Sequence, residues 1–346
     1  MARAPRARIS GYTLRILSVA ERLAGYDLFS HFSADRLAAL ARGIDSEKHP
    51  SGAYVLRQGE SSRDVYLLDR GGVRIQRGTT YGQYSLAILA RGELFGEASF
   101  IDGVPRSGDA FTTSPTEVLV FRAARLEPLL AEDPLLATAL YWTFWRSLSA
   151  KLRRTNEKIA RFFAESPAPP PVAGATARAG TGEFRVDLRT KRELFSEQKL
   201  SSLEINLLST LSRERRLKPG QEIFREGDPG DAMYVVLEGK VRISKLIPGI
   251  GEEALAILER GDYFGEMALI DHQPRSADAK AHDAAGAVVL SIPKEVVDGL
   301  LDIRKVSAVG LLKILCGLIA KRLREVDDKL VTWYILAGGH GGPEVR

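Results

Sequence analysis

The chain has 346 residues, of which 45% are hydrophobic and 27% charged, and this is the composition of a soluble globular protein. No apolar run approaches the roughly 18 residues of a transmembrane helix. The single cysteine excludes an internal disulfide, and the five histidines lack metal-ligand spacing. We therefore expect a cytoplasmic protein without a metal site, long enough for two domains.

The N-terminal stretch MARAPRARIS is basic and contains no acidic residue, within a chain whose net charge is +5. We interpret residues 1–25 as a solvated basic arm followed by a helix, because no apolar leader segment follows the arginines. Contact with an anionic lipid surface and a transit-like leader are the alternatives. The apolar spacing over residues 12–26 predicts a helix that packs on the first domain.

The chain repeats itself. VLRQGESSRDVYLLDRGGVRI, from Val55, recurs as IFREGDPGDAMYVVLEGKVRI, from Ile223, at an offset of 168 residues. FGEASFIDGVPRSGDA, from Phe95, recurs as FGEMALIDHQPRSADA, from Phe264, at an offset of 169. Agreement over this length indicates a tandem duplication with a single-residue insertion between the two segments.

The stretch between the copies, AESPAPPPVAGATARAGTGE, is rich in Pro, Ala and Gly and lacks large apolar residues. This composition predicts a flexible linker at 164–183. The copies on either side are then expected to form domains at 26–163 and 184–336. A Gly-rich tail at 337–346 ends the sequence.

Each copy contains short apolar segments separated by Gly-rich turns. In the first copy they are DVYLLD, GVRIQ, SLAIL and EVLVFRA, and in the second AMYVVLE, KVRISKL, ALAIL and GAVVLSI. Many short strands at close spacing predict an antiparallel barrel or jelly roll. The expected fold is mainly β with flanking α: two tandem antiparallel β jelly-roll barrels, each with N-terminal helices and a long C-terminal helix.

The two long trailing helices are predicted at about 133–163 and 303–336, and each carries one apolar stripe with near-heptad spacing. One interpretation is that each helix packs on its own barrel. The other is that the helices pair, within the chain or between two chains of a homodimer. The stripe residues are Phe144, Leu148, Leu152, Thr155, Ile159 and Phe162 in the first helix, and Leu312, Leu315, Ile319, Leu323, Val326, Leu330 and Trp333 in the second.

Glu266 and Arg275 are opposite charges in an otherwise small and apolar loop. A simple ion pair between them would add little stability, because desolvation offsets the attraction. Spread apart, the arginine suits a phosphate and the carboxylate suits ribose hydroxyls. Gly265 lets backbone N–H groups approach the same anion, and Ser276 adds a hydroxyl donor. The loop thus predicts a site for a small sugar phosphate with a flat base.

FGE, a short apolar stretch and PRSA together resemble the phosphate-binding cassette of the cyclic-nucleotide-binding domain. This family includes bacterial catabolite activator proteins, the regulatory subunits of cAMP-dependent protein kinase, and cyclic-nucleotide-gated channels. The REGDPGD turn and the closing long helix resemble it too. In the family the cassette glutamate binds the ribose 2′-hydroxyl and the arginine binds the cyclic phosphate, which implies these roles for Glu266 and Arg275, and for Glu97 and Arg106.

The binding residues that the resemblance implies fall in both copies. In the second copy they are Phe264, Gly265, Glu266, Met267, Ala268, Arg275, Ser276 and Ala277, and in the first copy Phe95, Gly96, Glu97, Ala98, Ser99, Arg106, Ser107 and Gly108. The first copy departs from the pattern, because RQGESSRD lacks the glycine corresponding to Gly230 and has Arg63 in place of Asp231. The second site is therefore the stronger prediction.

Ser and Ala after the arginine resemble cAMP binders more than cGMP binders, so cAMP is the expected ligand and cGMP the alternative. An aromatic lid on the base is often supplied by a helix beyond the barrel. Trp333 and Tyr334 are the candidates, and packing in the helix seam is their alternative role.

No catalytic motif is present, so we expect a regulatory protein and not an enzyme. Ligand binding would act through the long helices on a partner protein or an oligomer. Only AGGHGGPEVR follows residue 336, so a helix-turn-helix is not expected. One alternative is an inhibitor like a kinase regulatory subunit, whose inhibitory segment RARIS resembles only loosely. The other is a structural or membrane-associated adaptor with one or both pockets degenerate. The Ala- and Arg-rich usage fits a bacterial source.

Overall fold

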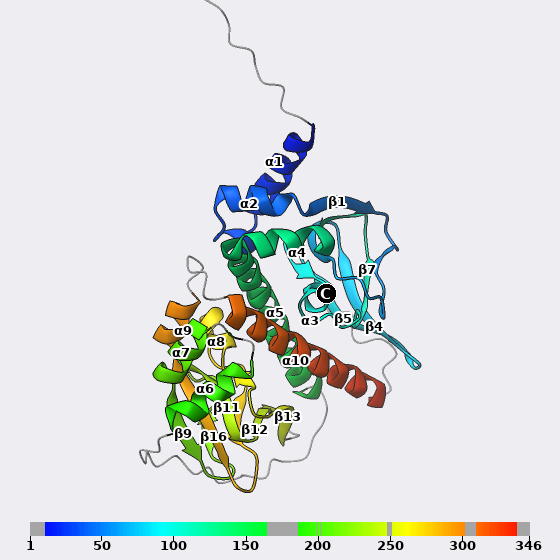
Figure 1. The fold of residues 1–346 in the computed structure, drawn as a ribbon. Coiled ribbons are helices and arrows are strands. Elements are labelled where there is room, and N and C mark those ends of the chain that lie inside the picture. Colours follow the sequence, from blue (N-terminus) through cyan, green and yellow to red (C-terminus); the bar gives the residue numbers. More distant parts are fainter. Residues whose placement is uncertain are drawn as a thin grey trace, which may run out of the picture. The chain divides into compact units, whose positions relative to one another are not determined.

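The computed structural model describes residues 11–164, 186–198, 200, 202–247, 251–301 and 309–337. The predictions for the basic arm with its RARIS segment, for nearly all of the linker and for the Gly-rich tail lie outside these residues. So does the predicted start of the second trailing helix. The chain divides into two compact units (Figure 1). One runs to Gly78 and resumes over Ala87–Thr143, and the other comprises Thr79–Leu86 and Phe144–Arg346.

Helices precede and follow the strands of the first copy. The predicted helix at 12–26 is confirmed as α1. Ser33 is the N-cap of α2, and its hydroxyl accepts a hydrogen bond from the Arg36 amide at 3.4 Å. The helical elements are α1 (Gly11–Ala24), the short η1 (Asp27–Phe29), α2 (Ala34–Ala41), α3 (Glu97–Asp102), α4 (Ala123–Glu132) and α5 (Pro134–Ala164). The strands are β1 (Ile44–His49), β2 (Tyr54–Leu56), β3 (Val65–Arg70), β4 (Val73–Thr79), β5 (Gly82–Leu89), β6 (Leu94–Phe95), β7 (Asp109–Thr112) and β8 (Thr116–Phe121).

The second copy repeats this order of elements. Its helices are α6 (Leu188–Ser196), α7 (Ser202–Leu211), α8 (Met267–Ile270), α9 (Lys294–Leu300) and α10 (Val309–Leu336). Its strands are β9 (Arg213–Leu217), β10 (Glu222–Phe224), β11 (Ala232–Gly239), β12 (Val241–Ile247), β13 (Gly251–Leu258), β14 (Tyr263–Phe264), β15 (Asp278–Ala281) and β16 (Ala287–Pro293). All the strands predicted from the sequence are present.

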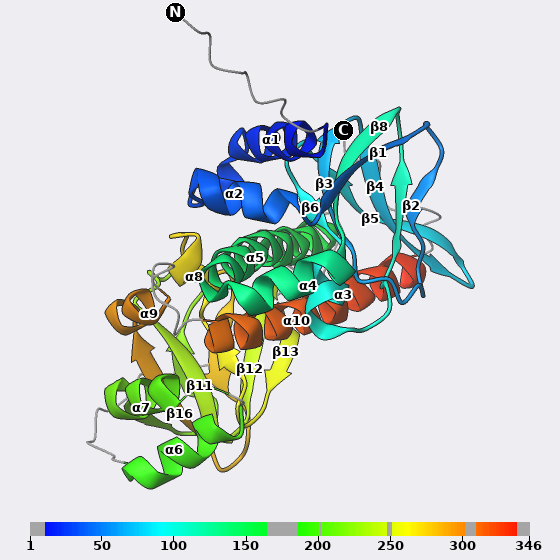
Figure 2. The ribbon, with the colours of Figure 1, turned by 45° about the horizontal axis from the view of Figure 1, so that its top comes forward.

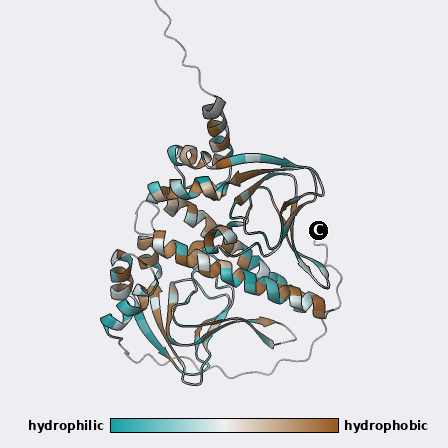
Figure 3. Cartoon of the chain, turned by 45° about the vertical axis from the view of Figure 1, so that its right-hand side comes forward, coloured by the Kyte–Doolittle hydropathy of each residue, from teal (hydrophilic) through white to brown (hydrophobic). Residues whose placement is uncertain are grey.

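Each copy forms two four-stranded antiparallel sheets, in the orders β1-β8-β3-β6 and β2-β7-β4-β5, then β14-β11-β16-β9 and β10-β15-β12-β13. Alternate strand residues enter the barrel core because successive side chains point to opposite faces. Tyr66 and Phe95 in the first core correspond to Tyr234 and Phe264 in the second. Apolar and polar residues both occur along the strands of each barrel (Figure 3), and β3, β11 and β16 are buried along most of their length. The prediction of two tandem jelly-roll barrels with flanking helices is confirmed.

The second unit contains α10 and the C-terminal two thirds of α5, from Phe144 onward (Figure 2). The Thr155 hydroxyl bonds the Asp327 carboxylate at 3.4 Å, and the rings of Phe162 and Tyr334 meet edge to face at 5.3 Å. On its other side α10 contacts the barrel, because Lys329 Nζ donates to the carbonyls of β13. Pairing of the two helices within the chain and packing of α10 on its own barrel therefore both hold within this unit, whereas pairing between two chains stays a prediction.

Across the described residues no helix, α5 and α10 included, reaches the combination of length and hydropathy that a membrane crossing requires. In the same residues no group of three or more His, Cys, Asp or Glu side chains is placed to hold a metal ion.

The turn between β11 and β12 requires a glycine at Gly239. Its φ is +71°, and an added Cβ would lie 2.4 Å from the Gly286 carbonyl oxygen. We expect Gly239→Ala to lower the free energy of unfolding by about 2 kcal/mol, because left-handed strain and the clash with backbone add. Gly317→Ala is the control: its Cβ meets open space within α10, so stability should rise by up to about 1 kcal/mol. Equal urea midpoints for the two variants would contradict this account.

Candidate ligand-binding site

The predicted cassette of the second copy begins where β14 ends and the short helix α8 follows. Gly265 joins them with a φ of +77°. A Cβ at this position would lie 2.8 Å from Arg275 Nη1, and that nitrogen donates a 2.6 Å hydrogen bond to the Gly265 carbonyl. Glycine is thus required twice here, once for the backbone conformation and once for the close approach of the guanidinium.

Arg275 is buried, with 3% of the residue exposed. Its Nη2 donates to the Ala232 carbonyl at 2.8 Å and to the Asp231 carboxylate at 3.0 Å, while its guanidinium lies 4.4 Å from the centre of the Phe224 ring. The Asp231 side chain is largely exposed, so solvent screens most of its attraction. Nε is buried and has no hydrogen-bond partner among the described residues. A buried cation is therefore held in place with one donor unused.

Glu266 is buried as well, with 2% exposed, and it binds a different partner from Arg275. Its Oε1 accepts a 3.1 Å hydrogen bond from Arg322 Nη1 on α10, and Arg322 Nη2 also donates to the Tyr263 carbonyl. Oε2 is buried and finds no hydrogen-bond partner in the described part of the chain. The two charges of the loop are thus spread apart, each with one polar atom still unpaired.

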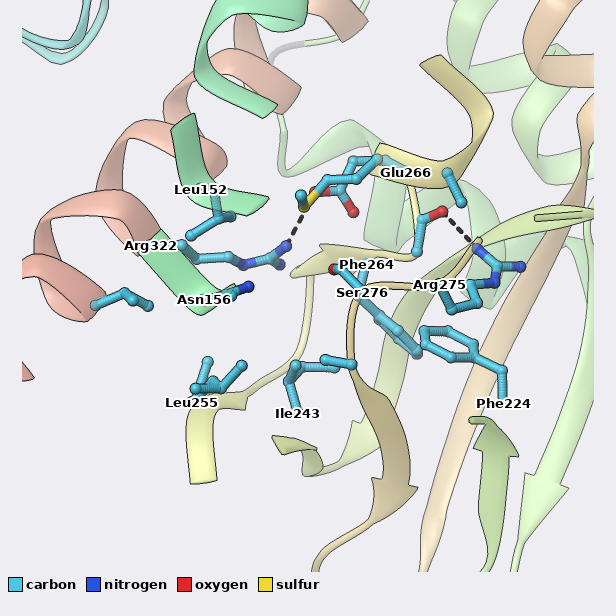
Figure 4. Close-up of a pocket in the computed structure, with 16 residues that line it drawn as sticks. Leu152, Asn156, Phe224, Ile243, Leu255, Phe264, Glu266, Arg275, Ser276 and Arg322 are labelled. Atoms are coloured by element: carbon cyan, nitrogen blue, oxygen red, sulfur yellow. Dashed lines mark hydrogen bonds and ion pairs between the residues drawn. The ribbon is translucent and has the colours of Figure 1, made fainter. Parts of the chain in front are cut away.

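Both side chains line a pocket that lies within the second unit and holds, with its mouth, about 570 Å³ of empty volume. Figure 4 shows Arg275 and Phe224 on one side of it and Leu152, Asn156 and Arg322 on the other. All eight residues predicted in the second copy line this pocket: Phe264, Gly265, Glu266, Met267, Ala268, Arg275, Ser276 and Ala277.

The sequence did not identify the other lining residues, which are Leu152, Asn156, Phe224, Ile243, Leu255, Ala256, Arg322 and Val326. Leu152 and Val326 belonged to the predicted helix stripes, but a stripe does not say what it faces. Phe224 and Ile243 stand in the repeated segment, and Leu255 and Ala256 in a predicted strand, but neither pattern assigns them to a pocket; Asn156 and Arg322 carry no motif. Trp333 and Tyr334 do not line the pocket. Tyr334 instead packs edge to face on Phe162 of α5, with ring centres 5.3 Å apart, which is the alternative of packing in the helix seam.

The cassette of the first copy spans β6, α3 and the segment before β7, and it includes all eight predicted positions: Phe95, Gly96, Glu97, Ala98, Ser99, Arg106, Ser107 and Gly108. Glu97, Ser99 and Arg106 are all at most 4% exposed. Arg106 repeats the backbone contacts of its counterpart, with Nη1 donating to the Gly96 carbonyl at 2.7 Å and Nη2 to the Asp64 carbonyl at 2.6 Å. Burial lowers the pKa of the Arg106 guanidinium, which nevertheless stays protonated at neutral pH.

The two sites differ at the position occupied by Ser62 in the first copy and Gly230 in the second. The Ser62 hydroxyl accepts from Arg106 Nε at 3.2 Å and from Nη2 at 3.1 Å. In the second copy a Cβ on Gly230 would lie 2.5 Å from the Ala268 Cβ, so no side chain fits without a shift. The first arginine is consequently satisfied by the protein itself, whereas Nε of the second is not.

Arg63, which replaces the aspartate of the second copy, lies against the first cassette helix. Its Nη2 donates to the Phe100 carbonyl at 2.7 Å, and its Nη1 pairs with Glu127 at 2.6 Å. The bulky substitution noticed in the sequence therefore changes the rim of the first site and leaves Arg106 without the carboxylate that Arg275 has.

Comparison with known proteins gives two matches to the family model for the cyclic nucleotide-binding domain, at residues 46–133 and 214–304, which together cover more than half of the chain. A cyclic AMP receptor protein of Thermus thermophilus is 38% identical over 131 residues, 38% of this chain and 58% of that protein. A cGMP-dependent protein kinase of Eimeria tenella is 25% identical over 264 residues, 76% of this chain but only 21% of the kinase. The chain thus spans less than two thirds of either relative.

Among solved structures, the regulatory domain of Toxoplasma gondii PKA with cAMP is 16% identical to this chain. The match covers 95% of this chain and 98% of that one, with a TM-score of 0.31.

Proposed function

The chain belongs to the family of cyclic nucleotide-binding domains, and on that premise we propose that it is a cAMP-responsive regulator whose principal binding site lies in its second copy. The role is binding and not catalysis, since the sequence carries no catalytic motif and the pocket residues are suited to holding a ligand. The ligand would be a cyclic phosphate joined to a ribose and a base.

The observation that carries this proposal is the pair of unpartnered polar atoms at the second site, Arg275 Nε and Glu266 Oε2. Leaving a buried donor or acceptor unpaired costs about 1–3 kcal/mol, more when the group is charged. A phosphate oxygen would accept from Nε, and a ribose hydroxyl would donate to Oε2. A cyclic nucleotide supplies both groups a few ångströms apart, so one ligand would satisfy both residues.

The two long helices are attached to the cassette, and this supports an output through them. Arg153 on α5 bonds the Asp271 carboxylate at 2.8 Å and the Pro274 carbonyl at 3.0 Å, just before Arg275 in the chain. Arg322 on α10 bonds Glu266. We propose that ligand binding shifts the cassette and with it these helices, changing their contacts with a partner protein or a second copy. The coupling is limited by the difference in ligand affinity between the two helix positions.

Calorimetry on the full chain with cAMP and with cGMP tests the proposal. We expect saturable binding of cAMP, tighter than that of cGMP, together with a rise in melting temperature. The absence of heat and of a thermal shift with either nucleotide would refute it.

A second candidate role applies to the first copy alone. Because Ser62 already occupies Arg106 Nε, the first barrel is suited to a structural role with a weakened pocket. We expect one tight site per chain in calorimetry, and two tight sites of equal affinity would exclude this role.

The Ser62 and Gly230 positions give a matched pair of variants. We expect Gly230→Ser to weaken cAMP binding at the second site about tenfold or more, because the new side chain meets Ala268 and its hydroxyl competes for Arg275 Nε. Ser62→Gly should leave the tight site unchanged. Titration of each variant with fluorescent cAMP measures the effect, and equal affinities for Gly230→Ser and the parent chain would contradict it.

A further inference from the structure

Asn156 is a buried amide in the wall of the second pocket formed by α5. Only 5% of the residue is exposed, it lines the pocket, and its Oδ1 has no hydrogen-bond partner among the residues described. Of the lining residues beside it in Figure 4, Leu152 and Leu255 are apolar, and Arg322 donates its hydrogen bonds to Glu266 and to the Tyr263 carbonyl. A leucine here would avoid the cost of about 1–3 kcal/mol that an unpaired buried acceptor carries, so the amide calls for a ligand group.

The proposed ligand would bring its base to this wall. Arg275 would hold the cyclic phosphate at the side of the pocket that contains Phe224, and Glu266, whose Oε1 bonds Arg322, would hold the ribose. Figure 4 shows Asn156 on the opposite side, beside Leu152. Since the base leaves the ribose on the side away from the phosphate, its polar edge would meet the α5 wall.

Resting on the proposed function, we propose that Asn156 is a specificity-determining residue of the second site and that its amide reads the edge of adenine. Oδ1 accepts from the exocyclic amino group, and Nδ2 donates to a neighbouring ring nitrogen, the bidentate pairing that an amide makes with adenine. The apolar side chains next to it pack on the base.

Adenine fits this wall better than guanine for two reasons. The unpaired atom is an acceptor, and adenine carries an amino donor at the position where guanine carries the acceptor O6. The cation that would suit guanine O6, Arg322, is already engaged by Glu266 and by the Tyr263 carbonyl. The residues after the cassette arginine are therefore not needed to determine base specificity, because Asn156 on α5 contacts the base directly.

The test uses the full chain and three probes: cAMP, cGMP, and purine riboside 3′,5′-cyclic monophosphate, which is cAMP without its 6-amino group. We expect the parent chain to bind cAMP about tenfold more tightly than the deamino analogue. Asn156→Leu removes the amide at similar volume. It should weaken cAMP binding about tenfold more than binding of the analogue, which loses only the contact between Nδ2 and its ring nitrogen, so that the ratio of the two affinities approaches one.

Glu157→Gln is the matched control, because Glu157 is the exposed neighbour of Asn156 on the same helix and should preserve the tenfold ratio. Two results would overturn the inference: a parent chain that binds cAMP and the analogue equally, or a leucine variant that loses affinity for all three probes by one factor. If that variant fails to fold, the ratio of the affinities of the parent chain for cAMP and for the analogue still tests the inference. Failure of the parent chain to bind any of the three nucleotides would instead refute the proposed function itself.

Discussion

Arg275→Ala is expected to weaken cAMP binding by at least about 100-fold, because it removes the only buried cation that both lines the pocket and has an unpaired donor in the described residues. A charge-assisted hydrogen bond contributes about 1.5–3 kcal/mol, and the phosphate also loses the attraction of the buried cation when the guanidinium is removed. Arg275→Lys keeps the charge but not the fork of donors, so it should recover only part of the affinity. Calorimetry with cAMP measures the series.

Arg106→Ala is the matched control for this series. Arg106 occupies the same position in the first copy and makes the same two backbone contacts, but its Nε already binds Ser62. We expect the tight site to survive this change. If Arg106→Ala abolished tight binding while Arg275→Ala spared it, the assignment of the principal site to the second copy would be wrong. Melting temperatures of both variants separate lost binding from lost structure.

Arg322→Ala is expected to lower the free energy of unfolding of the second unit by about 3 kcal/mol. The substitution leaves the Glu266 carboxylate, which is 2% exposed, without the one cation that it pairs with in the described residues. Removing one partner of a buried ion pair costs about 3–5 kcal/mol, and the lower end applies here because the arginine is itself partly exposed. Chemical denaturation followed by circular dichroism measures the change.

The double variant Arg322→Ala with Glu266→Gln should recover much of that loss, because a neutral amide no longer carries an unpaired buried charge. Lys294→Ala serves as the control. Its partner Asp298 is largely exposed, so removing this pair should change stability by less than about 0.5 kcal/mol. Equal destabilisation by Arg322→Ala and Lys294→Ala would show that the contact with Glu266 contributes nothing.

The cassette could be predicted from sequence because its residues lie within one short segment. Gly265, Glu266 and Arg275 are neighbours in the chain, and the turn that Gly265 forms places the arginine against its own loop. The duplication made the segment recognisable a second time. Local spacing also predicted the strands and helices, since burial on one face imposes a period of 2.0 or 3.6 residues on the chain.

The walls of the pocket could not be predicted in this way. Asn156 lies more than a hundred residues before the cassette and Arg322 about fifty after it, and neither belongs to a motif. The apolar stripes of α5 and α10 were visible in the sequence, but hydrophobic burial is non-directional and does not name the surface that a stripe covers. Their contacts follow from the packing of the second unit.

By itself, then, the sequence determined the duplicated barrels, the cassettes and the chemical class of ligand that they suit, because these depend on local periodicity and on residues close together in the chain. Only the tertiary structure decided what the sequence differences between the two copies do at the buried arginines. The sequence shows that the first copy has Ser62 where the second has Gly230. The hydrogen bond from Arg106 to the Ser62 hydroxyl, however, depends on a distance across the fold. The same holds for the unpaired atoms of Glu266, Arg275 and Asn156, because a missing partner is recognised only when every neighbour in space is known.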